Sequence, residues 1–346
     1  MELDEIKKVR IDKLRALVDQ GIAPYGGKFV ASTNIAEVLT NFTEDREVSL
    51  AGRIMAVRSH GKVFFMDLMD QSGRMQLFVK SDVIKMDIIK ALDIGDIIGV
   101  KGVLFKTKMG QESVRVAELV VLTKSLMTLP EKWHGLKDVE VRYRQRYVDL
   151  IANEYVRKVF IVRSKIISFI RSFLDQRDFL EVETPMIQPM AGGARGKPFK
   201  SHHNAYDLEV YLRIAPELYL KRLLVGGLER VYEINRNFRN EGVSTRHNPE
   251  FTMLEVYQSY GDFEDMMKLT EELVSGCVKE ITGSYKVQYQ GREIDFQTPW
   301  ERRSFAKIVK DKFDINPQDD AQTMLQKVKD KKGTKVKIDK LTRSAV

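Results

Sequence analysis

Apolar residues recur at helical spacing in the first segment of the chain, over residues 3–19. Gly21 follows this segment and provides a stop signal for a helix. The opposite side is basic, which suits either a solvated face or an arm that contacts an RNA backbone. The positions concerned are Lys7, Lys8, Arg10, Lys13 and Arg15.

Short apolar runs separated by turn signals follow over residues 47–125, and this pattern predicts β-strands. A helix over 82–92 interrupts them, so the order is three strands, a helix and two strands. That order is typical of an OB-fold, a small barrel that binds single-stranded nucleic acid by stacking bases on aromatic side chains. The strands are expected at 48–52, 63–68, 75–79, 97–105 and 114–121.

Two adjacent aromatic residues, Phe64 and Phe65, lie on the second predicted strand. Successive side chains of a strand point to opposite faces, so only one of the two can face the barrel interior. The other is available for a role at the surface.

The second half of the chain begins with a strongly amphipathic helix over 153–177. A strand at 179–184 stops at Pro185, and a glycine-bearing loop follows at 191–196. A further strand at 208–215 leads into a helix that starts at Pro216-Glu217 and ends at Gly226-Gly227. Residues 228–260 then predict a strand, a charged loop and a returning strand.

Alternation along the returning strand places Phe251, Met253, Glu255 and Tyr257 on one face. A carboxylate that is buried without a partner is costly, so Glu255 should have a cationic partner, either another side chain or the amine of a ligand. The loop before this strand gathers Arg236, Arg239, Arg246 and His247. Guanidinium groups bind phosphate and carboxylate, but a solvated basic hairpin fits the charge pattern equally well.

The composition is that of a globular protein of two domains, with 346 residues and 43% hydrophobic residues. The net charge of +8 favours a polyanionic partner only weakly. Cys277 is the one cysteine, which excludes an intrachain disulfide and a cysteine–histidine zinc site. No apolar run predicts a signal peptide or a membrane span, so we expect a cytoplasmic protein.

Several of these segments resemble class II aminoacyl-tRNA synthetases, and the lysine-specific enzymes most closely. Residues 238–241 (Phe-Arg-Asn-Glu) and their hairpin resemble motif 2, and residues 179–185 resemble motif 1, which forms the homodimer interface in that class. Longer runs, 213–241 and 192–194 among them, are similar to lysyl-tRNA synthetases. The resemblance covers the chain from residue 3 to about residue 310.

The resemblance implies roles for residues at matching positions. It makes Arg239 and Glu241 catalytic and assigns ATP binding to Arg239, Glu241, His247, Asn248 and Phe251. It assigns lysine binding to Gly193, Glu217, Glu255 and Tyr257, and reading of the anticodon to Phe65, Gln76 and Glu118. It therefore favours Phe65 over Phe64 as the residue that stacks on a base.

The implied partners are tRNA(Lys), L-lysine and ATP with Mg²⁺, and a second copy of the chain bound through the motif 1 region. The implied fold is α+β, with an N-terminal OB-fold barrel followed by an incomplete class II antiparallel sheet flanked by helices. We place the helical extension at 1–45, the anticodon-binding domain at 46–128, a linker at 129–142 and the catalytic part at 143–346.

The family's third motif, with its carboxylates for magnesium, has no match in this sequence. We therefore expect no metal ligand in this chain, and we expect the 346-residue chain by itself not to activate lysine. Two alternatives stay open: an aspartyl- or asparaginyl-type synthetase of the same class, and a non-catalytic tRNA-binding fragment. Glu217, Glu255 and Tyr257 suit an amine-bearing ligand, which favours lysine over aspartate or asparagine.

Overall fold

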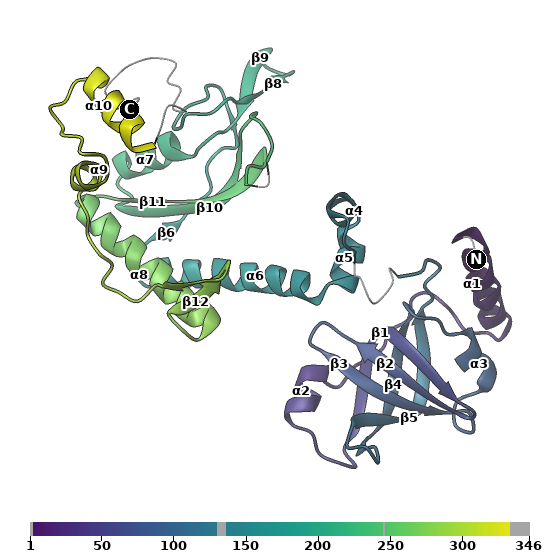
Figure 1. Cartoon of the computed structure of the whole chain (residues 1–346). Coiled ribbons are helices and arrows are strands. Elements are labelled where there is room, and N and C mark those ends of the chain that lie inside the picture. The colour runs from purple at the N-terminus through teal and green to yellow at the C-terminus, as the bar shows by residue number, and fades with distance from the viewer. Residues whose placement is uncertain (1–2, 130–135, 245, 333–346) are drawn as a thin grey trace. The chain divides into compact units, whose positions relative to one another are not determined.

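The computed structural model describes residues 3–129, 136–244 and 246–332, which belong to two compact units, Met1–Lys158 and Val159–Val346 (Figure 1). Residues 130–135 of the predicted linker lie outside the described residues. The three domain boundaries expected from the sequence stay predictions.

The first unit is built on a closed barrel with the strand order β1-β2-β3-β5-β4, in which β3 and β5 are parallel and the other pairs antiparallel. Each of the five predicted strands is present and longer than predicted, and the helix predicted at 82–92 is shorter. The elements are β1 (Glu47–His60), β2 (Val63–Met69), β3 (Arg74–Lys80), α3 (Met86–Ala91), β4 (Ile97–Lys106) and β5 (Glu112–Thr123).

Alternation along the strands fills the barrel. Met66 and Leu68 of β2 are fully buried together with Leu77 of β3, and Phe64 packs against the same core. Phe65 has the opposite parity and lies on the outer face, as the strand pattern predicted for one of the two rings.

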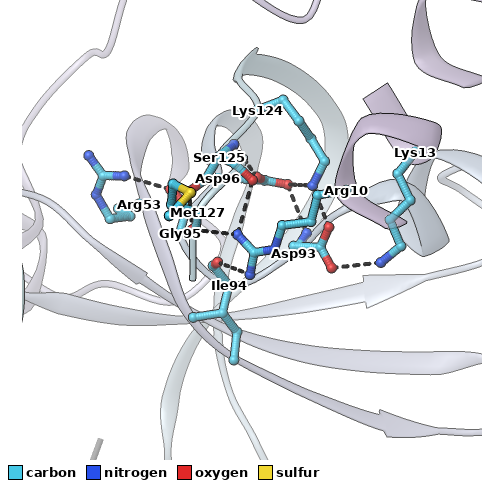
Figure 2. Close-up of polar contacts among 10 residues, drawn as sticks. All are labelled: Arg10, Lys13, Arg53, Asp93, Ile94, Gly95, Asp96, Lys124, Ser125 and Met127. Atoms are coloured by element: carbon cyan, nitrogen blue, oxygen red, sulfur yellow. Dashed lines mark hydrogen bonds and ion pairs between the residues drawn. The ribbon is translucent and has the colours of Figure 1, made fainter. Parts of the chain in front are cut away.

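Two helices cover other parts of this unit, α1 (Leu3–Asp19) and α2 (Ile35–Thr40), and Figure 1 shows α1 next to α3. Leu17 of α1 is fully buried in the barrel core. Arg10 donates hydrogen bonds to the carbonyl oxygens of Ile94, Ser125 and Met127, at 2.8–3.1 Å (Figure 2). Part of the basic side of α1 thus docks the helix onto the barrel, a role absent from both interpretations of the sequence.

A buried group of charges continues this contact. Lys124 has no exposed side-chain surface, and its Nζ lies 2.5 Å from Asp93 and 2.8 Å from Asp96 (Figure 2). Lys13 of α1 binds the other oxygen of Asp93 at 2.6 Å. Burial alone would raise the pKa of Asp93, but the hydrogen bonds from Lys124 and Lys13 bring it below its usual value.

Short helices α4 (Val139–Arg144) and α5 (Arg146–Ala152) precede the long α6 (Glu154–Asp175), which the sequence predicted. The second unit contains a sheet with the order β11-β10-β6. One face of this sheet packs against apolar residues of α6 and α8 (Figure 1). The elements are β6 (Leu180–Glu181), α7 (Glu217–Val225), β10 (Arg230–Phe238), β11 (Glu250–Gln258) and α8 (Phe263–Thr282).

The sheet is mixed, because β6 pairs in parallel with β10, whereas β10 and β11 are antiparallel as expected. The strand predicted at 179–184 is reduced to two residues. Thr184 leaves the ladder and instead donates from its N–H and Oγ1 to the carboxylate of Glu233. A proline then follows, and proline has no N–H to continue the pairing.

The remaining described elements are a sheet with the order β7-β9-β8, the hairpin β12–β13 and two helices. The strand predicted at 208–215 ends at Leu212, because Arg213 pairs with two separate segments, through Met186 and Phe238. The bounds are β7 (Ile187–Gln188), β8 (Phe199–His203), β9 (Leu208–Leu212), β12 (Lys286–Tyr289), β13 (Arg292–Asp295), α9 (Phe305–Phe313) and α10 (Ala321–Lys332).

None of the helices in the described part of the chain is both long enough and apolar enough to cross a bilayer.

The buried charges of Figure 2 give a stability prediction. Asp96→Asn removes the fully buried one of the two carboxylates that contact Lys124, and a hydrogen bond between charged groups contributes about 1.5–3 kcal/mol. We expect urea denaturation to show a loss of that size. Arg15→Ala, which breaks the exposed Arg15–Asp12 pair of α1, should cost about 0.5 kcal/mol or less. Equal losses of unfolding free energy in the two variants would contradict a stabilising role for the buried charges around Lys124.

Candidate active site and nucleic-acid interface

The candidate active site is built on the β10–β11 ribbon. Leu254 and Val256 turn toward the core shared with α6 and α8, so the alternate residues of β11 face the other way. The register places Glu233 of β10 opposite Glu255 and Asn237 opposite Phe251. The face predicted from the sequence, with Phe251, Met253, Glu255 and Tyr257, is thereby confirmed, and it gains a second polar row from β10.

A cavity of about 240 Å³ lies at the loop end of this ribbon. Its lining includes all five residues to which the resemblance assigned ATP binding. The guanidinium of Arg239 stands 5.2 Å from the ring centre of Phe251 and has no ion pair with any residue that the structure describes. The lining residues are Arg239, Glu241, Gly242, Arg246, His247, Asn248, Pro249 and Phe251.

The loop that contains Gly196 packs against this cavity. The Lys197 N–H donates to Glu241 at 3.2 Å, and the Lys197 carbonyl accepts from Asn240 at 2.7 Å. A Cβ atom at Gly196 would lie 3.3 Å from the Arg239 side chain and 3.4 Å from Glu241. The loop therefore holds these two side chains in place, and glycine permits the close approach.

A second group of predicted residues meets further along the ribbon. The Tyr257 hydroxyl donates to Glu255 at 2.9 Å. Gly193 has a φ of +85°, and a Cβ there would lie 3.0 Å from the Cβ of Glu217. Glu217 itself is in the first turn of α7 and pairs with Lys221 at 2.6 Å. All four residues with a predicted role in lysine binding thus share one region.

Glu255 has no cationic side chain in contact with it among the described residues. Burial raises the pKa of Glu255, and the nearby carboxylates of Glu217 and Glu233 raise it further. Burial and the hydrogen bond to Glu255 also raise the pKa of Tyr257. The sequence analysis allowed two cationic partners for Glu255, a side chain of the protein or the amine of a ligand. The described residues provide no contact of the first kind.

Sequence reasoning missed four polar residues next to this pocket. They are Arg213, Glu233, Asn235 and Asn237, of which Arg213 and Glu233 form a buried ion pair at 2.7 Å. The period of two that placed Glu255 also places Glu233, Asn235 and Asn237 on one face of β10. That signal was present in the sequence, whereas nothing in the sequence pointed to Arg213.

The described residues contain no group of three or more histidine, cysteine, aspartate or glutamate side chains able to hold a metal ion. Glu241 is the one carboxylate of the cavity lining, and it accepts the Lys197 N–H. These residues do not form a magnesium site, and we assign no step to that ion.

The barrel has its own candidate site on the outer face. Phe65 packs against Phe78 with ring centres 5.4 Å apart, and Phe78 packs against Phe105 at 5.5 Å. His60 extends this aromatic row on the other side of Phe65, at 6.0 Å. The row thus offers ring faces and edges to an unstacked base.

Gln76 shares this face, because its register partner is Asp67, two residues from Phe65. Arg58 joins them by donating to both Asp67, at 2.9 Å, and Gln76, at 3.2 Å. Glu118 is not brought to this group. It pairs with Lys101 at 2.7 Å, five positions beyond the Ser113 that binds Gln76.

The family of class II tRNA synthetases for aspartate, lysine and asparagine ("tRNA synthetases class II (D, K and N)") matches residues 138–338. The family "OB-fold nucleic acid binding domain" matches residues 48–122. The first match covers more than half of the 346 residues. The chain therefore belongs to the class II tRNA synthetases, with an OB-fold barrel at its N-terminal side.

Among curated proteins, the chain is similar to lysine–tRNA ligases. It is 56% identical to that of Carboxydothermus hydrogenoformans, over 90% of this chain and 64% of the relative. It is 54% identical to that of Syntrophomonas wolfei, over the same shares, and 55% identical to that of Pelotomaculum thermopropionicum, over 89% and 62%. The chain thus spans somewhat less than two thirds of the length of these relatives.

The raised pKa of Glu255 gives a prediction for stability. The folded state binds this proton more tightly than the unfolded state, so the contribution of Glu255 to stability falls as the pH rises through its folded-state pKa. Glu255→Gln should therefore increase the free energy of unfolding at pH 7 and lose that advantage below about pH 4. Urea denaturation at both pH values is the measurement.

The matched control is Glu229→Gln, which changes an exposed glutamate of the same unit. It should show no gain at pH 7. A Glu255→Gln variant that is less stable than wild type at pH 7 would show that Glu255 is satisfied by a protein partner.

Proposed function

We propose that this chain carries the substrate-binding part of a lysine–tRNA ligase, which joins lysine to tRNA(Lys) with ATP. The reaction has two steps. The lysine carboxylate attacks the α-phosphorus of ATP, which forms lysyl-adenylate and releases pyrophosphate. The 3′-terminal hydroxyl of the tRNA then attacks the lysyl carbonyl carbon and releases AMP.

The observation that carries this proposal is the state of Glu255. It is half-buried, accepts one hydrogen bond from Tyr257, and lies near the carboxylates of Glu217 and Glu233. A carboxylate in that position is stabilised by an ammonium group, since opposite charge restores the ionised form. A substrate with an acidic or neutral side chain would bring only its α-ammonium group, whereas lysine brings a second ammonium group on its side chain.

The cavity beside Arg239 supports the ATP half of the proposal. A free guanidinium suits the α-phosphate, where negative charge develops during adenylate formation, and a preorganised cation lowers the barrier most at that place. Phe251 provides an aromatic face for the adenine ring. The enzyme needs no covalent nucleophile, because positioning and charge stabilisation suffice.

The barrel supports tRNA as the partner, with Phe65 as the stacking residue and Gln76 as a hydrogen-bonding reader on the same face. The anticodon-reading role proposed for Glu118 rests on the resemblance to lysyl-tRNA synthetases. Leu180, which lies in the segment that resembles motif 1, is 51% exposed, and this supports a homodimer through that region. Translation would place the protein in the cytoplasm, with Mg²⁺ accompanying ATP.

The lysine specificity can be tested in a fusion that adds the remaining part of the Carboxydothermus relative after the matched region. We expect ATP–pyrophosphate exchange that depends on lysine and not on aspartate or asparagine. Glu255→Gln should lower lysine-dependent exchange about 10- to 100-fold, because it removes a hydrogen bond between charged groups. Exchange driven by aspartate or asparagine would identify the other substrates of the class.

The tRNA partner can be tested on the chain itself with the anticodon stem-loop of tRNA(Lys). Phe65→Ala should weaken binding about 5- to 150-fold, since base–aromatic stacking contributes about 1–3 kcal/mol. Tyr25→Ala is a matched control, because Tyr25 is half-exposed in the same unit but pairs with Thr123 away from the aromatic row. Fluorescence anisotropy measures both, and equal affinities for the two variants would contradict the proposal.

A further inference from the structure

The pocket rests on a fully buried pair of opposite charges. Arg213 and Glu233 have side chains that are 0% and 1% exposed, and Nη1 of Arg213 lies 2.7 Å from Oε1 of Glu233. Arg213 comes from the segment after β9, and Glu233 comes from the middle of β10. Removing one partner of such a pair would leave the other charge buried and unpaired.

Glu233 has little capacity left for a ligand. Its Oε1 also accepts hydrogen bonds from the Thr184 N–H, at 3.2 Å, and from Asn235 Nδ2, at 3.1 Å. Its Oε2 accepts from Thr184 Oγ1 at 2.7 Å. Four donors therefore fix this carboxylate, and three of them come from segments other than β10.

Arg213 is held just as firmly on its protein side. Nε donates to the Arg236 carbonyl at 2.8 Å, and Nη1 donates to the Thr184 carbonyl and Oγ1 at 3.2 and 3.0 Å. Nη2 is buried and has no hydrogen-bond partner among the described residues. The hydrogen bonds of Nε and Nη1 thus fix the orientation of the guanidinium, while Nη2 has no acceptor in contact with it among the described residues.

Glu255 stands directly across the ribbon from this pair. Glu233 and Glu255 are register partners on the same face, so their Cβ atoms are about 5 Å apart. Two like charges at that spacing destabilise each other unless a cation compensates one of them. Arg213 compensates Glu233 by contact, whereas no hydrogen bond links Arg213 to Glu255 in the described structure.

We propose that Arg213 and Glu233 are positioning residues for the amino-acid pocket: as a neutral buried pair, they reserve Glu255 for the ammonium group of the substrate. This inference rests on the proposed function for the identity of that substrate. The hydrogen bonds of this pair connect Thr184, β10 and the segment before α7 beside Glu255. Protein donors already occupy the carboxylate of Glu233, so Glu255 is left to accept the amine of the substrate.

The charges around Glu255 agree with this arrangement. Four groups act on it: Tyr257 on its own strand, Glu217 at the start of α7, Glu233 on β10 and Arg213 after β9. Glu217 and Glu233 disfavour the ionised carboxylate, and Arg213 favours it by a smaller amount than Glu233 disfavours it. The ion pair therefore affects the pKa of Glu255 without forming a hydrogen bond to it.

The test is a ¹³C NMR titration of the Glu255 carboxyl group in the 346-residue chain, without any ligand, assigned with Glu255→Gln. Glu233→Gln should lower the pKa of Glu255 by about one unit, because a like charge is lost and Arg213 becomes free to attract Glu255. The double variant Arg213→Met with Glu233→Gln leaves no lone buried charge, and it should lower the pKa by a smaller step.

Glu181→Gln is the matched control. Glu181 also forms an ion pair, with Arg171 at 2.9 Å, and it contacts Tyr232, which packs in the core on the opposite face of the sheet. Its substitution should leave the pKa of Glu255 unchanged. A role limited to holding the fold together would leave that pKa unchanged in all folded variants, and this result would overturn the proposal. The double variant decides the matter if Glu233→Gln does not fold.

A separate arm follows the same carboxyl signal while L-lysine is added, with norleucine, which lacks the side-chain amine, as the comparison ligand. Wild type should respond to lysine alone, and the double variant should bind lysine at least tenfold more weakly. A wild-type chain that ignores lysine would refute the proposed substrate. The titration without ligand would still decide whether Arg213 and Glu233 control Glu255.

Discussion

The candidate active site depends on the pairing register of β10 and β11. Burial of Leu254 and Val256 against α6 and α8 determines which face of the ribbon packs against the core. Because successive side chains alternate, every other side chain then lies on the opposite face. A slip of one residue would bury Glu255 in an apolar core and expose the apolar row. The hydrophobic core thus determines the chemistry of the pocket.

Both units use fully buried ion pairs where separate segments must be held together. Lys124 and Asp96 join the segment after β5 to the turn before β4, while Arg213 and Glu233 join three segments beside the pocket. Each pair is surrounded by backbone donors or acceptors, which reduces the cost of burying charge. In the barrel this arrangement serves stability, and beside Glu255 it also sets the charge available to a ligand.

Local patterns in the sequence predicted most of the fold. The barrel strands, α1, α6, the start of α7 and the β10–β11 ribbon follow from alternation, helical spacing and a proline-first helix, since these elements satisfy local rules. The strands at β6 and β9 were predicted too long. Thr184 and Arg213 leave their ladders for partners distant in the sequence, and no local pattern records such partners.

The same distinction applies to the candidate site. Phe251, Glu255 and Tyr257 were placed together by parity alone, and Arg239 entered as part of a basic loop. Their roles came from the resemblance, as did those of Gly193 and Glu217, which meet only because the glycine loop packs on α7. Arg213 could not have been found, because its significance lies in a contact 20 residues away with Glu233.

The most direct test of this account is a crystal structure of the protein with a non-hydrolysable lysyl-adenylate analogue. We expect an amino group of the lysyl moiety within about 3 Å of Glu255, with the phosphate mimic at Arg239 and the adenine on Phe251. An analogue bound with its amino groups directed away from Glu255, and Glu255 paired instead with a side chain of the protein, would contradict it.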